Sequence, residues 1–586
     1  MSTIPQMFLS TCRRFAGVSN KVAYAQRKGG EWVYHTHDQL LDSVAGVALG
    51  LLRMGLVPGD RIGIVSENRT EWAICNYAAT CAGLVDVPVF PTLTAPQLQY
   101  IFEDSGAAAV VVSNAFQLKK ILEIWPELPS LQFVVTIEAI DIEDRRVVHL
   151  DNLIEIERTH TSLEQQHDKL EQMAERVHAA DVLTIIYTSG TTGEPKGVML
   201  THGNLVANIE AGLKRISVTD TDVFVSYLPL CHSYERMSGY YLAFFAGASV
   251  YIAESIDSVA ERMREVRPTI MTSVPRLFER IRARILGSVE RDSPRKQRIF
   301  HWAMAVGDEF DRGHTSPLVR LQRSLADRLV FSKIRERMGG RLRFFVSGGA
   351  ALGAELGRFF RIVGIRIVEG YGLTETSPVI AVHSLNDIVL GTVGPPLDNV
   401  MVRIADDGEI LVRGPSIMKG YWKNDVATKE VLTPDGWLHT GDIGEIDSNG
   451  HLRITDRKKH LLVSSGGKNI APQPIEQLLL QSPLIDQIML VGDAREYCTA
   501  LVVPQAEVVK ELLAKDPSAD LHKLIEADIN VLQRDLAKYE RVRRFAILPE
   551  PFTIDNGMLT PTLKVKRKAV LAAYSDIIDG LYERHV

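Results

Sequence analysis

The sequence predicts an α/β fold: a large N-terminal domain with two βαβ-type sheets and a β-rich subdomain, then a small α+β C-terminal domain. Strand-like and helix-like segments alternate over 19–112, 181–252 and 268–380, which predicts mostly parallel sheets covered by helices. After Asn386 the chain becomes rich in Gly, Pro and short alternating strands. The 586 residues, of which 46% are hydrophobic, can form several cores.

The first alternating region contains the plainest patterns. Arg61–Val65 and Leu84–Val89 are predicted strands, and Thr70–Ala82 between them has the apolar stripe of a helix, so the three predict a βαβ unit. Ala107–Val112 predicts a strand, because six apolar residues fall far short of the ~18 that cross a bilayer. Glu157–Arg176 is polar and predicts a surface helix.

The second half of the chain predicts a domain boundary near Asp456, which gives an N-terminal domain of 1–455 and a C-terminal domain of 456–586. The β-rich subdomain covers about 387–455 and includes the predicted strand Val400–Ile404. In the C-terminal domain we expect helices at Gln473–Gln481 and Leu521–Tyr539 and strands at Ile488–Val491 and Ala500–Val503.

Composition excludes several classes of protein. The net charge of −6 argues against general nucleic-acid binding. Five cysteines, odd in number and without a C-x-x-C pair, argue against a disulfide framework or a zinc cluster and fit a reducing cytosol. The first residues lack the pattern of a secretory signal. We therefore expect a cytoplasmic protein.

Residues 276–343 are a local exception in charge, with 17 Lys and Arg against 8 Asp and Glu, a net of +9 beside −15 for the remainder. Phe278–Leu286 and Leu318–Met338 repeat apolar residues at helical spacing, which predicts amphipathic helices with arginine-rich outer faces. Such a face can simply be solvated. It can also contact an anionic membrane surface or a phosphate-bearing ligand.

The strongest functional motif is a loop between two apolar, strand-like segments, with four hydroxyls, three glycines and one lysine in ten residues. Glycines let several backbone N–H groups converge on one anion, hydroxyls add neutral donors, and a lysine adds a mobile positive charge. This chemistry suits a polyphosphate, with a flexible hairpin as the alternative. Neither G-x-x-x-x-G-K-S/T nor G-x-G-x-x-G occurs, so a P-loop or Rossmann site is not predicted. The candidate residues are Thr188, Ser189, Gly190, Thr191, Thr192, Gly193 and Lys196.

This loop resembles the signature of the acyl-adenylate-forming superfamily, which includes acyl-CoA synthetases, aryl-CoA ligases, luciferases and peptide-synthetase adenylation domains. Further motifs follow in the family order over nearly the whole chain. The resemblance implies a barrel-like β-rich subdomain, a mobile C-terminal lid domain, and the use of ATP, Mg²⁺ and coenzyme A.

A second motif, Gly370–Thr376, follows a predicted strand and places an aromatic ring, a hydroxyl and a carboxylate in one short turn. A ring can stack on a base, a hydroxyl can bind phosphate, and a carboxylate can hold Mg²⁺. The resemblance implies these roles for Tyr371, Thr374 and Glu375, with Gly372 in the same turn. A helix-capping turn with an exposed Glu is the alternative.

Small residues follow the next predicted strand, at Ser347, Gly348 and Gly349. They let a planar ring approach the backbone, and the resemblance implies adenine contact and one wall of an acyl channel. A plain strand-to-helix turn is the alternative. Leu228–Arg236 resembles the acyl-pocket pattern of long-chain fatty acid synthetases, which implies that His232 lies near the substrate carboxylate and takes part in catalysis. A buried structural histidine is the alternative.

Motifs nearer the C-terminus resemble the remaining family sites. The resemblance implies that Asp442 and Arg457 contact the ribose of ATP. It also implies that Lys459 is the hinge residue, within 456–459, and that Gly467 lets the pantetheine arm of coenzyme A pass close to the backbone.

Lys564 matches the lysine that the family needs for adenylation. The attacking carboxylate and the phosphate that it must reach are both negative, so an ammonium between them stabilises the transition state. Leu563 stands where the common pattern has glycine, which is typical of long-chain members.

Together these motifs imply an ATP-dependent long-chain fatty acid–CoA ligase that acts through an acyl-adenylate. The long-chain assignment depends on Pro229–Arg236, Thr560–Arg567 and the basic segment 276–343. Transfer to a carrier protein, and a medium-chain, aromatic or isoprenoid acid, stay open. A non-catalytic acyl or nucleotide sensor is a further alternative, disfavoured because Lys564, Glu375 and Asp442 are all present.

The expected partners are fatty acid, ATP and coenzyme A, with no nucleic acid. A greasy substrate partitions into membranes, so a peripheral contact through 276–343 at the inner face of a membrane is a further hypothesis. The oligomeric state stays open, with a homodimer as one option.

Overall fold

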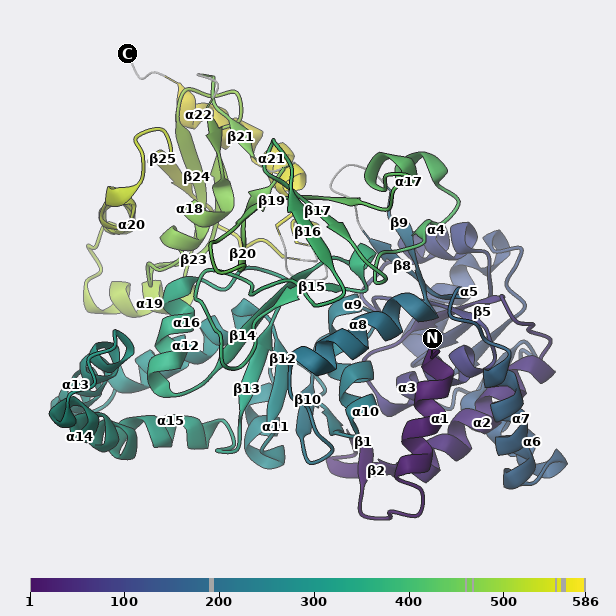
Figure 1. Ribbon diagram of the computed structural model, residues 1–586. Helices are drawn as coiled ribbons and strands as arrows, with labels where there is room; N and C mark the ends of the chain where they lie inside the picture. The colour runs from purple at the N-terminus through teal and green to yellow at the C-terminus, as the bar shows by residue number, and fades with distance from the viewer. Residues whose placement is uncertain are drawn as a thin grey trace. The chain divides into compact units, whose positions relative to one another are not determined.

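The computed structural model describes residues 2–188, 194–458, 461–465, 468–553, 556–559 and 565–583 (Figure 1). The chain forms two compact units. The first unit comprises Met1–Val402, Val412–Leu438 and Ser448–Leu452, and the second comprises Arg403–Leu411, His439–Asp447 and Arg453–Val586.

The first unit contains two eight-stranded sheets. In the first sheet the strand order is β15-β14-β13-β12-β10-β11-β1-β2, parallel except at the edge strands β2 and β15. Its strands are β1 (Val22–Lys28), β2 (Glu31–Thr36), β10 (Val223–Ser226), β11 (Ser249–Ile252), β12 (Ile270–Ser273), β13 (Phe344–Ser347), β14 (Ile367–Gly372) and β15 (Val379–Val382). The predicted mostly parallel arrangement is confirmed.

The second sheet has the order β18-β9-β8-β4-β3-β5-β6-β7, parallel from β8 to β7 and antiparallel at β9 and β18. Its strands are β3 (Arg61–Val65), β4 (Val85–Val89), β5 (Ala107–Val112), β6 (Phe133–Thr136), β7 (Val147–His149), β8 (Val182–Thr188), β9 (Lys196–Thr201) and β18 (Gly420–Tyr421). Strands β3 and β5 have the predicted bounds, and α3 (Thr70–Cys81) connects β3 to β4 as expected.

Helices cover these sheets. Besides α3, the helical segments before Thr201 are α1 (Ile4–Arg14), α2 (His37–Arg53), α4 (Ala95–Ser105), α5 (Ala115–Ile124), the 3₁₀ turn Trp125–Glu127, α6 (Leu150–His160) and α7 (Leu163–Glu175). The prediction of a single helix over Glu157–Arg176 is wrong, because α6 ends at His160 and a separate helix, α7, begins at Leu163. Ser162 starts α7 with a capping box, in which its hydroxyl accepts from the N–H of Gln165 at 3.3 Å.

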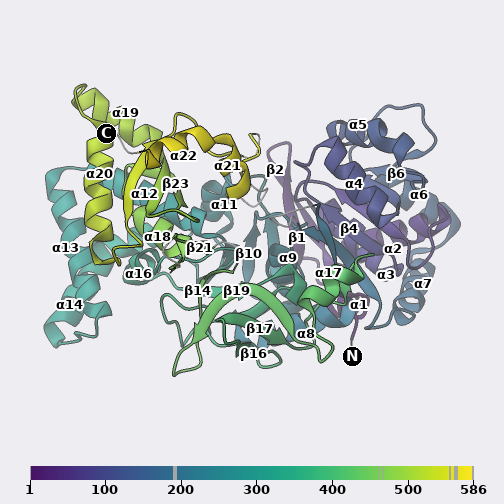
Figure 2. The same ribbon diagram turned by 90° about the horizontal axis from the view of Figure 1, so that it is seen from above.

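The remaining helical segments of the first unit lie between Thr201 and Leu438. They are α8 (His202–Arg215), α9 (Ser233–Glu235), a π-helix (Arg236–Leu242), α10 (Ala243–Ala246), α11 (Val259–Val266), α12 (Pro275–Glu290), α13 (Pro294–Asp311), α14 (Pro317–Ala326), a second π-helix (Asp327–Phe331), α15 (Ser332–Arg337), α16 (Ala354–Val363), the 3₁₀ turn Thr374–Thr376 and α17 (Asp425–Val431). Helices α13 and α14 lie at the outer edge of this unit, beyond α12 and α16 (Figures 1 and 2).

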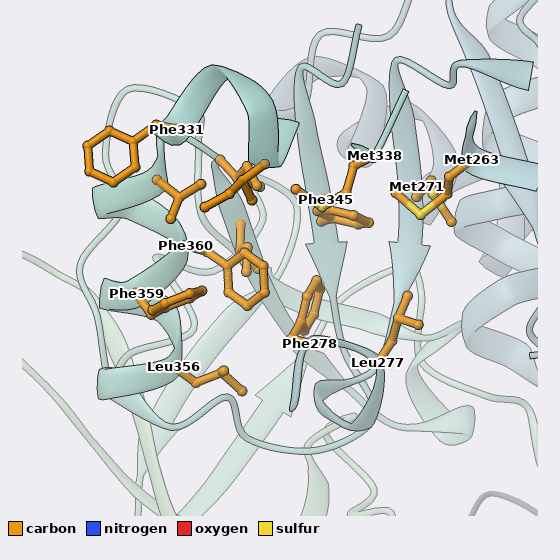
Figure 3. Packing of buried hydrophobic residues seen from close by; sticks show 14 of the residues in the cluster. Met263, Met271, Leu277, Phe278, Phe331, Met338, Phe345, Leu356, Phe359 and Phe360 are labelled. Atoms are coloured by element: carbon orange, nitrogen blue, oxygen red, sulfur yellow. The ribbon is translucent and has the colours of Figure 1, made fainter. Parts of the chain in front are cut away.

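The basic segment packs on the first sheet through an aromatic core (Figure 3). Phe278 of α12 is fully buried and meets the rings of Phe345 and Phe360 edge-on, with centroids 5.1 Å and 5.6 Å apart. The amphipathic helix predicted over Phe278–Leu286 is confirmed, since its apolar residues pack in this core. Over Leu318–Met338 only part of the prediction holds: Val319, Ala326, Phe331, Ile334 and Met338 are buried, whereas Leu318, Leu321, Leu325 and Leu329 are exposed. Within the described residues, no helix has the length and apolar content needed to cross a bilayer.

A four-stranded sheet occupies the region that the sequence predicts to be β-rich. Its order is β16-β17-β19-β20, with strands β16 (Met401–Ile404), β17 (Glu409–Arg413), β19 (Leu438–Ile446) and β20 (Leu452–Arg457).

The second unit contains a three-stranded sheet in which β23 and β24 are antiparallel and β24 and β25 are parallel. Its elements are β21 (Leu462–Val463), β22 (Asn469–Ile470), α18 (Pro472–Leu479), β23 (Ile485–Val491), β24 (Cys498–Pro504), α19 (Ala506–Lys515), α20 (Leu521–Leu532), the 3₁₀ turn Gln533–Asp535, β25 (Val542–Ile547), α21 (Arg567–Ala573) and α22 (Ser575–Tyr582). The predicted helix Leu521–Tyr539 is too long, because the buried Gln533 amide bonds both backbone groups of Val542 and turns the chain into β25.

Candidate active site

The phosphate-loop motif lies in the chain between β8 and β9, which pair antiparallel. Thr188 and Lys196 face each other across this antiparallel pair, and the Thr188 hydroxyl donates to the Lys196 carbonyl at 3.5 Å. The other predicted loop residues, Ser189, Gly190, Thr191, Thr192 and Gly193, lie outside the described residues. The two ends of the motif are thus brought together at one edge of the second sheet.

The second motif lies at the end of β14 in the first sheet. Tyr371 is half-buried and pairs with Ala381 of β15. At Gly372 any side chain would overlap the carbonyl oxygen of Pro378, so only glycine allows this close turn. The turn leads into the 3₁₀ segment that carries Thr374 and Glu375.

Tyr421 connects the two motifs. Its hydroxyl donates to Oε1 of Glu375 at 3.0 Å, and Nζ of Lys196 lies 5.2 Å from the centroid of its ring. Burial, and then the charge of Glu375, raise the pKa of Tyr421, so the phenol stays a proton donor. The sequence interpretation missed Tyr421, because its only local signal is the triplet Gly420–Trp422 and its neighbours are more than forty residues away in the chain.

Thr374 is also connected to the motif around His232. The hydroxyls of Ser233 and Thr374 lie 3.1 Å apart, so the acyl-pocket pattern and the Glu375 turn meet. His232 is half-buried, and its Nδ1 accepts from the backbone N–H of Tyr234 at 3.2 Å. The histidine therefore caps a short helical turn, which fixes its ring beside the Thr374 turn.

The small residues after β13 lie against Tyr234. The Tyr234 hydroxyl donates to the carbonyls of Ser273 at 3.2 Å and Val346 at 2.9 Å, and a Cβ at Gly348 would come within 2.9 Å of the ring. Ser347 is buried, and its hydroxyl has no hydrogen-bond partner among the described atoms. Gly349 has a φ of +79°. The space beside Gly348 is filled by the Tyr234 ring, whereas Gly349 is exposed, with its nearest neighbour, Val274, 3.8 Å from the position of a Cβ. A polar ligand atom would satisfy Ser347.

The next two residues of the acyl-pocket pattern anchor it to both sheets. Glu235 accepts hydrogen bonds from Ser226 of β10, at 2.5 Å, and from Thr272 of β12. Burial raises the pKa of Glu235 to about 7, against the lowering effect of those hydroxyls. Arg236 instead donates to the second sheet, to Asp86 of β4 at 2.7 Å and to Thr184 of β8 at 2.9 Å. The sequence interpretation named neither residue as functional.

In the second unit, Asp442 of β19 and Arg457 of β20 form an ion pair. Oδ1 of the buried Asp442 lies 2.9 Å from Nε of Arg457. One carboxylate with an adjacent guanidinium can bind a pair of hydroxyls, as on a ribose. Lys459, Gly467 and Lys564 lie outside the described residues.

The charged groups suit a magnesium polyphosphate rather than a tightly caged metal. Among the described residues, no three His, Cys, Asp or Glu side chains are grouped to hold a metal ion. Mg²⁺ needs no such cage, since it keeps waters and takes substrate phosphate oxygens beside one or two carboxylates. Glu375 fits that role, and the Lys196 ammonium contacts the same tyrosine.

Comparisons with known proteins show which family the chain resembles. Residues 13–422 match the family of AMP-binding enzymes, and residues 459–586 match the AMP-binding enzyme C-terminal domain. The chain is 37% identical to the long-chain-fatty-acid–CoA ligase FadD15 of Mycobacterium tuberculosis, over 96% of this chain and 94% of the relative. It is 33% identical to the peroxisomal long chain acyl-CoA synthetase 6 of Arabidopsis thaliana, over 94% of this chain and 82% of the relative.

Solved structures share the fold. The anthranilate CoA ligase AuaEII in complex with anthranoyl-AMP matches with a TM-score of 0.76 and 20% identity, over 98% of each chain. ATP-bound MatB from Rhodopseudomonas palustris matches with a TM-score of 0.72 and 24% identity, over 98% of this chain and 100% of that chain. At this identity the matches concern the fold, and they confirm the predicted mixed α/β class.

Proposed function

Because the chain belongs to the AMP-binding enzyme family, we propose that it is an AMP-forming long-chain fatty acid–CoA ligase. It converts fatty acid, ATP and coenzyme A into acyl-CoA, AMP and pyrophosphate. The acid and the acceptor are proposed from the near-full-length relatives that are named long-chain-fatty-acid–CoA ligase and long chain acyl-CoA synthetase. One geometric observation supports the proposed adenylation chemistry: Lys196 and Glu375 both contact Tyr421.

In the first step, a carboxylate oxygen of the acid attacks the α-phosphorus of ATP and pyrophosphate leaves. The loop from Thr188 to Lys196 would hold the phosphates, Glu375 would hold Mg²⁺, which would offset the phosphate charge, and Lys564 would offset the repulsion between carboxylate and phosphate. Tyr371 stacks on the base beside Ser347–Gly349. Asp442 accepts from the ribose hydroxyls, oriented by Arg457 at 2.9 Å.

In the second step, the thiol sulfur of coenzyme A attacks the acyl carbonyl, the thiol proton passes to solvent, and AMP leaves with the bonding pair. We propose that 456–586 moves as a lid relative to 1–455, turning about Lys459. This rotation withdraws Lys564 and presents Gly467, so one site performs two reactions in sequence.

The first experiment measures acid-dependent AMP release with coenzyme A present, across acids from acetate to long fatty acids and cinnamate-type acids, with detection of the thioester. A maximum at long chains with thioester formed supports the proposal. A maximum on short, medium-chain or aromatic acids contradicts the long-chain assignment. AMP without thioester indicates a carrier-protein acceptor, and no AMP with any acid indicates a sensor.

We also propose that this cytoplasmic enzyme contacts an anionic membrane through the basic segment 276–343, at α14 and the π-helix after it. Leu318, Leu321, Leu325 and Leu329 are 63%, 69%, 49% and 39% exposed, at a spacing that places them on one helix face. Arg320 and Arg328 are exposed beside them and form no ion pair among the described residues. An apolar stripe flanked by unpaired arginines is complementary to anionic lipid headgroups.

Vesicle co-sedimentation tests this contact. We expect binding to vesicles that contain phosphatidylglycerol and weak binding to pure phosphatidylcholine. Leu321→Ser with Leu325→Ser should weaken binding roughly 10-fold, because two leucines no longer enter the apolar layer. Val426→Ser is the matched control, an exposed apolar residue on α17, and should bind as the unaltered protein does. Equal binding by the leucine variant would contradict the proposal.

A further inference from the structure

Tyr421 is placed by backbone bonds rather than by its side chain. Strand β18 pairs with β9, so that Tyr421 lies opposite Val198, and the N–H of Trp422 donates to the Gly197 carbonyl at 2.7 Å. On the other side, the N–H of Met418 donates to the Glu375 carbonyl at 2.9 Å. The same short segment is therefore bonded to the strand that starts at Lys196 and to the turn that carries Glu375.

The segment is also anchored away from the site. The Trp422 indole N–H donates to the Asp104 carbonyl at 3.0 Å, and the Tyr421 N–H donates to the Thr428 hydroxyl at 2.9 Å. The Tyr421 side chain is only 7% exposed. Few rotamers are open to a side chain held in this way, so its ring and hydroxyl have defined positions.

The two charges that meet at Tyr421 would otherwise attract each other. Lys196 and Glu375 are not within ion-pair distance, and Lys196 forms no ion pair among the residues that the structure describes. The ring face attracts the ammonium, while the hydroxyl donates to the carboxylate. Tyr421 thus contacts both charged groups without neutralising either, so the ammonium and the carboxylate both stay available to a substrate.

We propose that Tyr421 is a positioning residue that presents the Lys196 ammonium and the Glu375 carboxylate together to magnesium–ATP. The proposal rests on the proposed function, which assigns phosphate binding to Lys196 and Mg²⁺ to Glu375. It adds that the two roles depend on different parts of one side chain. The hydroxyl positions Glu375, which would bind Mg²⁺, whereas the ring positions Lys196, which would bind the phosphates.

Two variants separate these parts. Tyr421→Phe keeps the ring and removes the hydroxyl, and Tyr421→Leu removes both. Isothermal titration calorimetry measures the affinity for ATP in the absence of acid, first with Mg²⁺ and then with EDTA. Both roles can thus be tested without turnover. Tyr421→Phe should weaken magnesium–ATP binding roughly 3- to 10-fold and leave metal-free ATP binding unchanged, since a hydrogen bond to a charged group is lost. Tyr421→Leu should weaken both, metal-free ATP by roughly 3-fold, since a cation–π contact is lost.

Tyr187→Phe is the matched control. Tyr187 lies on β8, and its hydroxyl donates to the carboxylate of Asp104 on α4 at 2.5 Å. This variant therefore also removes a tyrosine–carboxylate hydrogen bond. It should leave the Mg²⁺ dependence of ATP binding unchanged. A thermal unfolding scan confirms that each variant is folded.

Three results would overturn the role of Tyr421: unchanged magnesium–ATP binding in Tyr421→Phe, equal weakening of both ATP forms by Tyr421→Phe, or the same change in Tyr187→Phe. Failure of the proposed function looks different, because the unaltered protein would then bind no ATP and release no AMP with any acid.

Discussion

The guanidinium of Arg236 donates to the carboxylate of Asp86 at 2.7 Å, and both side chains are fully buried. The residue before it, Glu235, bonds the first sheet, so two consecutive residues connect the acyl-pocket motif to both sheets. Strand β8, which leads to Thr188, is held by the same guanidinium through Thr184. The two halves of the site are thus joined inside the core of the first unit.

Arg236→Met should destabilise the protein strongly. The substitution leaves the Asp86 carboxylate buried without its partner, which costs about 3 to 5 kcal/mol of unfolding free energy. Denaturant unfolding with intrinsic fluorescence measures the change. Arg14→Met is the control, since Arg14 and Asp220 form an exposed pair worth at most about 1 kcal/mol. Equal effects of the two variants would contradict a structural role for the buried pair.

Glu235 should make the stability of the protein fall as the pH rises. Burial raises the pKa of Glu235 from 4.5 to about 7 in the folded state. Between these two pH values the carboxyl group ionises in the unfolded protein but stays protonated in the folded protein, so the unfolded state is stabilised relative to the folded state. The penalty grows from pH 4.5 to about 7 and then stays constant, at about 3 kcal/mol. Glu235→Gln should remove this part of the slope. Parallel stability curves for the two proteins between pH 5 and 8 would refute the assignment.

The sequence predicts the elements whose causes are local. Strands β3 and β5 have their predicted bounds, because short apolar runs buried on both faces leave little choice of structure. The helix from Leu521 was predicted too long, because the residue that ends it, Gln533, bonds Val542 in a later strand.

The residues of the site also divide into those whose contacts are local in the sequence and those whose contacts depend on the order of strands in the sheets. The hairpin ends Thr188 and Lys196 are separated by a few residues, and their approach could be predicted from the motif between them. Tyr421 and Arg236 could not, since each acts through a partner that only the sheet order brings near. Asp86 carried one faint signal, a charge inside an otherwise apolar strand pattern.

Lys564→Ala should separate the two half-reactions. Loss of this electrostatic stabiliser should cut acid-dependent formation of the acyl-adenylate by at least ~10²-fold. Thioester formation from a supplied acyl-adenylate should continue, because the lysine is proposed to be withdrawn in that step. Quenched-flow measurement of each half-reaction tests this. An equal loss in both would contradict alternation of the lid domain.

Gly348→Ala should weaken ATP binding through Tyr234. The new Cβ would lie 2.9 Å from the Tyr234 ring, and that ring cannot easily yield because its hydroxyl is bonded to the carbonyls of Ser273 and Val346. Overpacking of this kind costs about 1 to 3 kcal/mol, which should appear as lower stability and a roughly 10-fold weaker affinity for ATP. Gly353→Ala, five residues further on, adds a Cβ with nothing within 4 Å and should change neither quantity. If the two variants bind ATP equally well, the backbone at Gly348 does not contact the nucleotide, and the adenine must be held elsewhere.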